Sequence, residues 1–237
     1  MKLSELLGVK KFYDSTLEEV LLSMSGDYEE AGRGSFGVTL KHSSKPTVVK
    51  FWISDSSYDN FINYVAAHPS KHLPKLYSKP KELSSFFARP KEFPDKVNYV
   101  KMEKLESIRN EADADLISFL FNQLSKMHSK KEVDTLIKSL EEYKDSPHSE
   151  WVRLEELVND LPKFLHEMFE MLHHLLNGKN ILDIHDENIM LRANGELVIT
   201  DPIYNKSDMD KVESIQTALY HLKKEEAIKG KTPKGLT

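Results

Sequence analysis

The distribution of apolar and polar positions divides the chain into a β-rich region followed by a helical region. Residues 30–105 contain short runs rich in β-branched and apolar residues at 38–40, 47–53 and 98–102, separated by Gly, Pro and Ser. Runs bounded in this way are typical of strands. From residue 110 onward, apolar residues recur at the spacing of one helix face. The pattern therefore predicts an α+β chain whose strands come first.

Capping and turn residues support the expected helices. Pro162 stands near the start of one periodic segment and Asn177-Gly178 at its end, as expected for the two ends of a helix. Ser15, with Glu18 three residues later, forms the capping pattern of an earlier helix. Helices are expected at residues 15–25, about 57–67, 116–127, 164–176 and about 208–226, with a loop at 144–150.

A short hairpin is expected within the helical region. Residues 189–191 and 197–199 are apolar, and Asn194-Gly195 lies between them. Asn-Gly between two apolar runs is a strong hairpin signal because both residues tolerate positive φ.

Composition narrows the classes of protein that remain. The 237 residues are 39% hydrophobic and 30% charged, which is enough to build a core in one large domain or two small ones. The formal net charge of −5 argues against specific nucleic-acid binding, which needs a basic surface. The absence of cysteine excludes disulfides, thiolate nucleophiles and cysteine-ligated zinc. No apolar run approaches the roughly 20 residues of a membrane helix, so a cytoplasmic protein is expected.

Two features of the β-rich region suggest phosphate binding. Gly32, Gly34 and Gly37 form a GxGxxG pattern, and glycines let backbone N–H groups approach phosphates closely. A Gly-rich turn in a hairpin explains the pattern equally well. Lys50 lies inside an apolar strand, where an ammonium group is costly unless it is paired. An outward-facing lysine on an edge strand is the simpler alternative.

The strongest chemical signal lies in the helical region. Asp183 and Asn188 fall in a polar segment between apolar flanks, and Asp201 ends the second run of the expected hairpin. Carboxylate and amide oxygens that converge in this way suit magnesium and phosphate. A plain acidic turn would explain either half alone, but not both halves with a hairpin between them.

Together these residues resemble the protein-kinase-like fold. The segments 182–190, 194–195 and 199–202, together with 58–77, are similar to the early serine/threonine protein kinases of T-seven-like bacteriophages. The similarity runs from about residue 28 to 206. It implies phosphate binding by Lys50 and the Gly-rich residues Gly32, Gly34, Ser35 and Gly37, an adenine-binding hinge at Glu103 and Leu105, a catalytic Asp183, and magnesium binding by Asn188 and Asp201.

The resemblance implies a bilobal fold and an activity. A small β-rich lobe would cover residues 1–105, and a helical lobe carrying a short catalytic hairpin would cover residues 106–237. The implied reaction is transfer of the γ-phosphoryl group of ATP, with Mg²⁺, to Ser and Thr of host proteins. The enzyme would act in the cytoplasm of an infected bacterium, with ATP and host proteins as partners and no membrane. The oligomeric state stays open.

The chain departs from the usual kinase pattern at several positions. Leu182 replaces the arginine that precedes the catalytic Asp in many kinases, and Pro202 and Ile203 replace the Phe and Gly of D-F-G. The expected helix at 57–67 contains no Glu to pair with the strand lysine. Asp59 is its only acid, and the apolar pattern places Tyr58 in the facing position instead.

Two alternatives remain at the level of function. His185 lies two residues after Asp183, where protein Ser/Thr kinases usually have Lys, and this favours an aminoglycoside-type small-molecule phosphotransferase. The other alternative is an inactive kinase-like binding module. The missing helix Glu favours an inactive module. The opposing observation is the presence of Lys50, Asp183, Asn188 and Asp201.

Overall fold

The computed structural model describes residues 27–33, 37–53, 55–82, 97–108, 110–142, 144–145, 150–176, 179–205 and 207. The helices expected at 15–25 and 208–226 lie outside these ranges, as do Gly34 and Ser35. Within the described ranges, no helix is both long and apolar enough to span a membrane.

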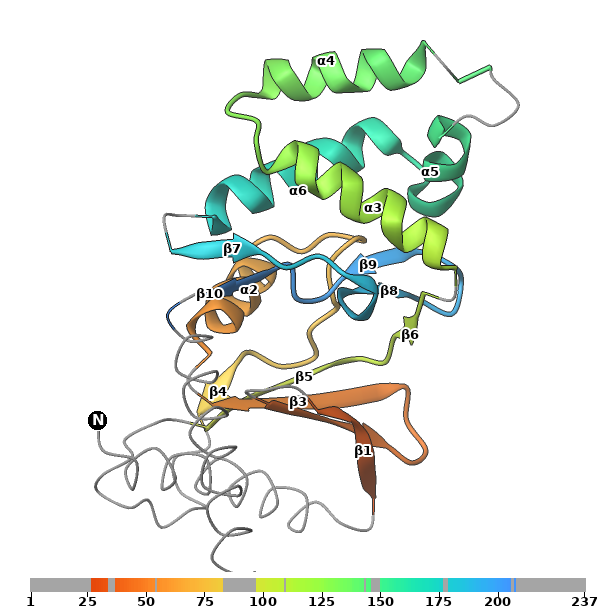
Figure 1. Ribbon diagram of the computed structural model, residues 1–237. Helices are drawn as coiled ribbons and strands as arrows, with labels where there is room; N and C mark the ends of the chain where they lie inside the picture. Colours follow the sequence, from red (N-terminus) through yellow and green to blue (C-terminus); the bar gives the residue numbers. More distant parts are fainter. Residues whose placement is uncertain are drawn as a thin grey trace, which may run out of the picture.

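A five-stranded antiparallel sheet occupies one end of the described structure (Figure 1). Its central strand β3 lies between β2 and β5, and Lys50 of β3 pairs in register with Thr39 and Val100. The three expected strands are confirmed, and two strands without a clear sequence signal are added at the edges. In spatial order the strands are β1 (Tyr28–Arg33), β2 (Gly37–His42), β3 (Thr47–Ile53), β5 (Val97–Glu103) and β4 (Lys81–Glu82).

The helix α2 (Ser56–Ala67) follows β3 directly and confirms the helix expected at about 57–67. Its N-cap is Asp55, whose carboxylate accepts a hydrogen bond from the Tyr58 backbone N–H and so satisfies one of the unpaired donors of the first turn. Phe61, Ile62 and Val65 are buried on one face. The helix packs against α6 and β10, and its apolar face therefore belongs to the main core.

The helices α3, α4, α5 and α6 form the other end of the described structure (Figure 1). The central helix is α6, which packs against the other three and has eight buried side chains. Pro162 lies in its first turn, as expected from the sequence, and Asp160 caps it, which the sequence analysis did not predict. The segment expected as a loop at 144–150 ends at Glu150, where α5 begins. The helices are α3 (Glu111–Leu124), α4 (Lys130–Glu141), α5 (Glu150–Val158) and α6 (Leu161–Leu175).

Short strands lie between the sheet and these helices in Figure 1. The expected hairpin is confirmed as β8 (Ile189–Leu191) and β9 (Leu197–Ile199), with Gly195 at φ +86° in the turn. The left-handed conformation explains the glycine at this position. The remaining short elements are β6 (Glu106–Ser107), β7 (Asn180–Leu182), the 3₁₀ turn η1 (Asp186–Asn188) and β10 (Ile203–Asn205), with β6 beside β8 and β10 beside β7.

One continuous core connects these parts. Trp52 from β3 and Tyr58 from α2 belong to the same buried cluster as Phe121 of α3 and Phe164 of α6. The chain is therefore α+β, as predicted, and its sheet and helices are joined through α2 and the short strands.

Candidate active site

Lys50 contacts Asp201 across 151 residues of sequence. The Lys50 Nζ atom donates a hydrogen bond to Asp201 Oδ2 at 3.1 Å, and about a quarter of each side chain is exposed (25% and 24%). Burial acts to lower the pKa of Lys50, but the surrounding groups, chiefly the Asp201 carboxylate and with it Tyr58 and Asp55, together outweigh burial, so the pKa is raised. Lys50 is therefore a paired, charged residue and not a solvent-facing lysine on an edge strand.

Tyr58 occupies the position that a helix glutamate has in most kinases. The Lys50 Nζ atom lies 3.7 Å from the centroid of the Tyr58 ring, a distance typical of a cation–π contact. The ring is 1% exposed and meets Trp52 edge-on, with 4.9 Å between centroids. Asp59 points elsewhere, since its Oδ1 accepts hydrogen bonds from Trp52 Nε1 and Asn98 Nδ2. No acid of α2 pairs with Lys50 in the described structure, and an aromatic face meets the ammonium instead.

The β8–β9 hairpin brings the predicted metal ligands together. Ile189 pairs with Ile199, so Asn188 lies opposite Thr200, whose backbone N–H donates to the Asn188 carbonyl at 3.0 Å. The Asp183 N–H donates to the Pro202 carbonyl at 2.8 Å. These backbone bonds fix the segment that contains Asp183 beside the segment that contains Asp201.

Asn188 is buried, and its amide has a defined orientation. Its Nδ2 donates to the Asp183 carbonyl at 2.7 Å and lies 3.0 Å from His185 Nε2. Its Oδ1 accepts no hydrogen bond from any residue that the structure describes. An amide oxygen left open in this way can act as a ligand for a hard cation.

The site holds more carboxylates than cations. Burial raises the pKa of Asp201 to about 6, and the Asp55 and Asp183 carboxylates act in the same direction against the lowering effect of Lys50. Burial also raises the pKa of Asp183, and Asp55 adds to the shift. Crowded, partly dehydrated carboxylates disfavour their own charge, and a bound cation relieves that repulsion. Asp55, the cap of α2, was not identified as part of this cluster from the sequence.

Asp201 and Asn188 suit magnesium, which needs few protein ligands, better than a metal ion whose ligands all come from the protein. Among the described residues, no three His, Cys, Asp or Glu side chains form a group able to cage a metal ion. Magnesium usually takes one or two carboxylates and completes its shell with phosphate oxygens and water. Asp201 and the Asn188 amide oxygen match that smaller set of ligands.

The Gly-rich segment is described only at its two ends. A Cβ atom at Gly32 would meet no atom within 4 Å, so packing does not require glycine there. A Cβ at Gly37 would lie 2.3 Å from the Phe51 carbonyl oxygen, so the close approach of β2 to β3 does require glycine. Gly37 is thus explained by the sheet, whereas Gly32 leaves open space in which a ligand could approach the backbone of β1.

The expected hinge is fixed by an arginine that the sequence did not indicate. Arg192 forms a two-pronged ion pair with Glu103, with distances of 2.9 Å from Nε to Oε2 and 2.7 Å from Nη2 to Oε1. The guanidinium also donates to the carbonyls of Lys71 and Leu73. The Glu103 side chain is therefore occupied. The N–H groups of Glu103 and Lys104 donate to the carbonyls of Lys75 and Pro46, whereas the Leu105 N–H makes no hydrogen bond to the described residues and remains available to a ligand.

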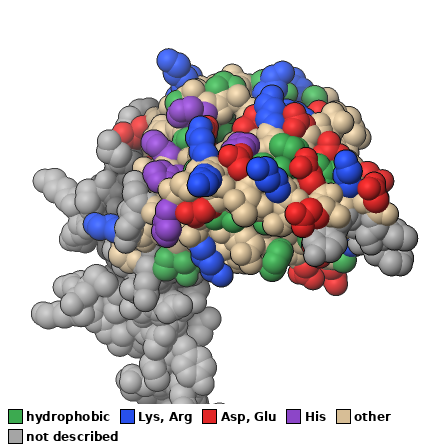
Figure 2. Space-filling model, turned by 90° about the horizontal axis from the view of Figure 1, so that it is seen from above, with side chains coloured by type: hydrophobic (Ala, Val, Ile, Leu, Met, Phe, Trp, Pro, Cys, Tyr) green, Lys and Arg blue, Asp and Glu red, His purple; other side chains and the backbone are tan. Residues whose placement is uncertain are grey.

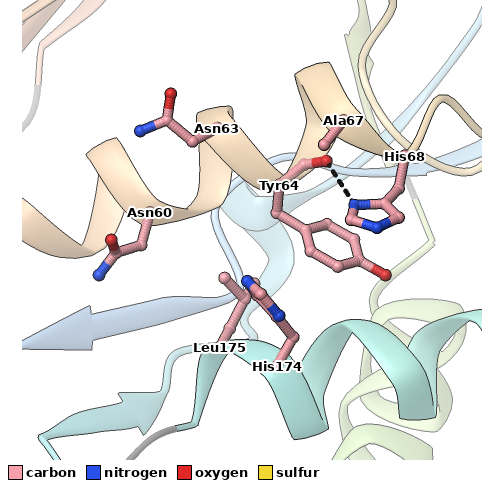
Figure 3. A pocket seen from close by; sticks show the side chains of 7 residues that line it. All are labelled: Asn60, Asn63, Tyr64, Ala67, His68, His174 and Leu175. Carbon is pink, nitrogen blue, oxygen red and sulfur yellow. Dashed lines mark hydrogen bonds between the residues drawn. The ribbon is translucent and has the colours of Figure 1, made fainter.

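A pocket of about 210 Å³ lies on the other side of α2 (Figure 3). Asn60, Asn63 and Ala67 lie about 140–200° around the helix from Tyr58, given 3.6 residues per turn. The pocket therefore faces away from Lys50. Its lining residues are Asn60, Asn63, Tyr64, Ala67, His68, His174 and Leu175.

The face seen in Figure 2 carries interspersed charges of both signs. This face therefore offers no patch of a single sign for a polyanion.

Comparison with known families supplies the class of protein. The sequence model described as bacteriophage T7 protein kinase 0.7 matches residues 98–231, more than half of the chain. The chain belongs to this phage kinase family. The resemblance inferred from the sequence is thereby confirmed over a range that includes Asp183, Asn188 and Asp201, while Lys50 and the Gly-rich segment precede the match. No curated protein matches the chain. Membership in the phage kinase family supports a phosphotransferase of the protein-kinase kind.

Proposed function

We propose that the chain is an ATP- and Mg²⁺-dependent serine/threonine protein kinase that phosphorylates host proteins in the cytoplasm of an infected bacterium. We infer a two-lobed arrangement, with residues 1–105 forming the sheet lobe, residues 106–237 the helical lobe, and ATP between them. The observation that carries the proposal is the Lys50–Asp201 contact at 3.1 Å. This contact brings the lysine that would bind phosphate next to the aspartate that would bind magnesium, and phosphoryl transfer needs these two groups at one site.

The phosphates would be held by cations and backbone groups. The Lys50 ammonium is positioned between Asp201 and the Tyr58 ring and is the cation that would contact phosphate oxygens. The backbone of Gly32, Gly34, Ser35 and Gly37 would add N–H donors. Adenine would meet the backbone of Glu103 and the N–H of Leu105, because the Glu103 carboxylate is taken up by Arg192.

Magnesium would be held by Asp201 and the Asn188 amide oxygen. Held there, magnesium would supply positive charge that stabilises the transferring phosphoryl group. Asp183 would accept a hydrogen bond from the acceptor hydroxyl, orient it and take its proton. Burial raises the pKa of Asp183, which makes its carboxylate a better proton acceptor than an exposed aspartate.

The proposal is tested by incubating the protein with γ-labelled ATP and a bacterial lysate, with and without magnesium. Label should appear on Ser and Thr of lysate proteins only with magnesium. Asp201→Asn should lower the rate by roughly a hundredfold or more, since metal stabilisation of transferring phosphate is worth several kcal/mol. Glu187→Gln changes an exposed acid in the turn just before Asn188; it is the control and should keep the wild-type rate.

The same experiment separates the alternatives. Transfer to an added aminoglycoside but to no lysate protein would favour a small-molecule phosphotransferase. No transfer to either, with nucleotide still bound, would favour an inactive module.

A further inference from the structure

The orientation of the Asn188 amide can be assigned from its two partners. The Asp183 backbone carbonyl can only accept a hydrogen bond, and it lies 2.7 Å from one terminal atom of the amide. That atom must therefore be the nitrogen. The assignment depends on a backbone oxygen and does not depend on the state of any side chain.

The second amide proton identifies the role of His185. The same nitrogen, Nδ2, lies 3.0 Å from His185 Nε2. Since Nδ2 is a donor with no lone pair to offer, His185 Nε2 must be the acceptor, and the ring proton must be on Nδ1. The nearest carboxylate oxygens lie beyond hydrogen-bond distance of the ring, with Asp186 Oδ1 3.7 Å from Nδ1 and Asp183 Oδ1 3.8 Å from Nε2, so the assignment rests on the Asn188 contact.

Both protons of the amide are thus used by the loop itself. Asp183 and His185 hold Nδ2 from two directions, so the amide cannot rotate without losing a hydrogen bond inside a buried site. Only Oδ1 is left to meet a ligand. We propose that His185 is a positioning residue that locks the Asn188 amide with its oxygen available to the metal; this rests on the proposed function.

The contact with Asn188 gives His185 a role that does not depend on the substrate. A lysine ammonium has donors and no acceptor, so lysine at position 185 could not receive the Asn188 N–H. His185 is accounted for by its contact within the loop, and it need not signal a small-molecule acceptor. His185 therefore favours neither a protein kinase nor a small-molecule phosphotransferase.

The test compares three replacements of His185 in the full-length chain. Gln carries an amide group near the position of Nε2 and can present an oxygen there, whereas Asn is too short and Leu has no acceptor. The readout is calorimetric binding of a non-hydrolysable ATP analogue over a series of magnesium concentrations, which needs no catalytic turnover. Melting temperatures without metal check that each variant is folded, and Glu187→Gln is the control in the same turn.

We expect His185→Asn and His185→Leu to need roughly tenfold more magnesium for half-maximal nucleotide binding, as is typical when a group that orients a ligand is lost. His185→Gln should stay within about threefold of the wild type, and binding without magnesium should not change in any variant. Unchanged magnesium dependence in the Leu variant, or equal losses in Gln and Leu, would overturn the inference. A wild-type chain that shows no magnesium-dependent nucleotide binding would instead overturn the proposed function.

Discussion

Replacement of Tyr58 tests whether an aromatic ring can serve where kinases normally use a helix glutamate. Tyr58→Phe keeps the ring below the Lys50 ammonium, and Tyr58→Leu removes it. If the ring positions Lys50 on the phosphates, the Phe variant should retain nearly full phosphoryl transfer and the Leu variant should not. The ring is 1% exposed and its centroid is 3.7 Å from Nζ, so the contact is close and largely shielded from water.

The size of the effect follows from that environment. A cation over an aromatic face is worth about 0.5–1 kcal/mol when exposed and about 2 kcal/mol when desolvated. Lys50 is 25% exposed, which places its contact at about 1–2 kcal/mol. At about 1.4 kcal/mol per factor of ten, Tyr58→Leu should lower kcat/KM for ATP by roughly 5- to 30-fold. The Phe variant should remain within about threefold of the wild type.

Initial rates over a range of ATP concentrations measure this effect, at a temperature where melting curves show every variant to be folded. Loss of the ring beside Trp52 also lowers stability, by about 1–3 kcal/mol for a buried substitution of this kind. A second cycle in a Lys50→Met background separates the two effects. There Tyr58→Leu should cost stability but cause no further loss of rate. Equal rates for the Leu and Phe variants in the wild-type background would refute the positioning role.

Three further outcomes are expected. Because the pKa of Asp201 is raised from 3.8 to about 6, its contribution to stability is fully present below about pH 4 and is lost as the pH rises through 6. Between pH 4 and pH 8, thermal melts without metal or nucleotide should therefore show the free energy of unfolding of the wild type falling by up to about 3 kcal/mol relative to that of Asp201→Asn. Arg192→Ala should lower the free energy of unfolding by about 3 kcal/mol in urea titrations, because Glu103 loses its charged partner inside the fold and keeps only the hydrogen bond from the Lys75 N–H. An unchanged midpoint would contradict this. Protein treated with a phosphatase should phosphorylate substrate at full rate without a lag, and a lag removed by pre-incubation with ATP would contradict it.

Elements with a strong internal pattern could be predicted from the sequence. β3, α2 and α6 each have a run of buried residues at the right spacing, and the β8–β9 hairpin has a turn sequence that fits its geometry. The strands β4, β6, β7 and β10 have two or three residues each, which is too short to show alternation. Such strands exist because a neighbouring strand pairs with them.

In the candidate site, too, local contacts could be predicted from the sequence and contacts between distant segments could not. Asp183 and Asn188 are joined by a local loop, so their spacing alone predicted their proximity. The partner of Lys50 was sought on the next helix, but the structure pairs Lys50 with Asp201, 151 residues away. Arg192 and Glu103 are 89 residues apart and meet through long side chains, for which neither position gives any local signal. Contacts of this kind depend on the packed fold and not on neighbouring residues.

The segment after Asp201 explains why no activating phosphate is expected. In kinases that need one, the phosphate orders a loop by pairing with arginines, one of them beside the catalytic Asp. Here Leu182 precedes Asp183 in place of an arginine. Leu182 belongs to β7 and pairs with Ile203 of β10. Asp201 is therefore held between β9 on one side and β10 on the other, and the Asp183 N–H bonds to the Pro202 carbonyl. The position of Asp201, the proposed metal ligand, depends on backbone pairing that is already present among the described residues of the unmodified chain, so added phosphate is not needed to fix it.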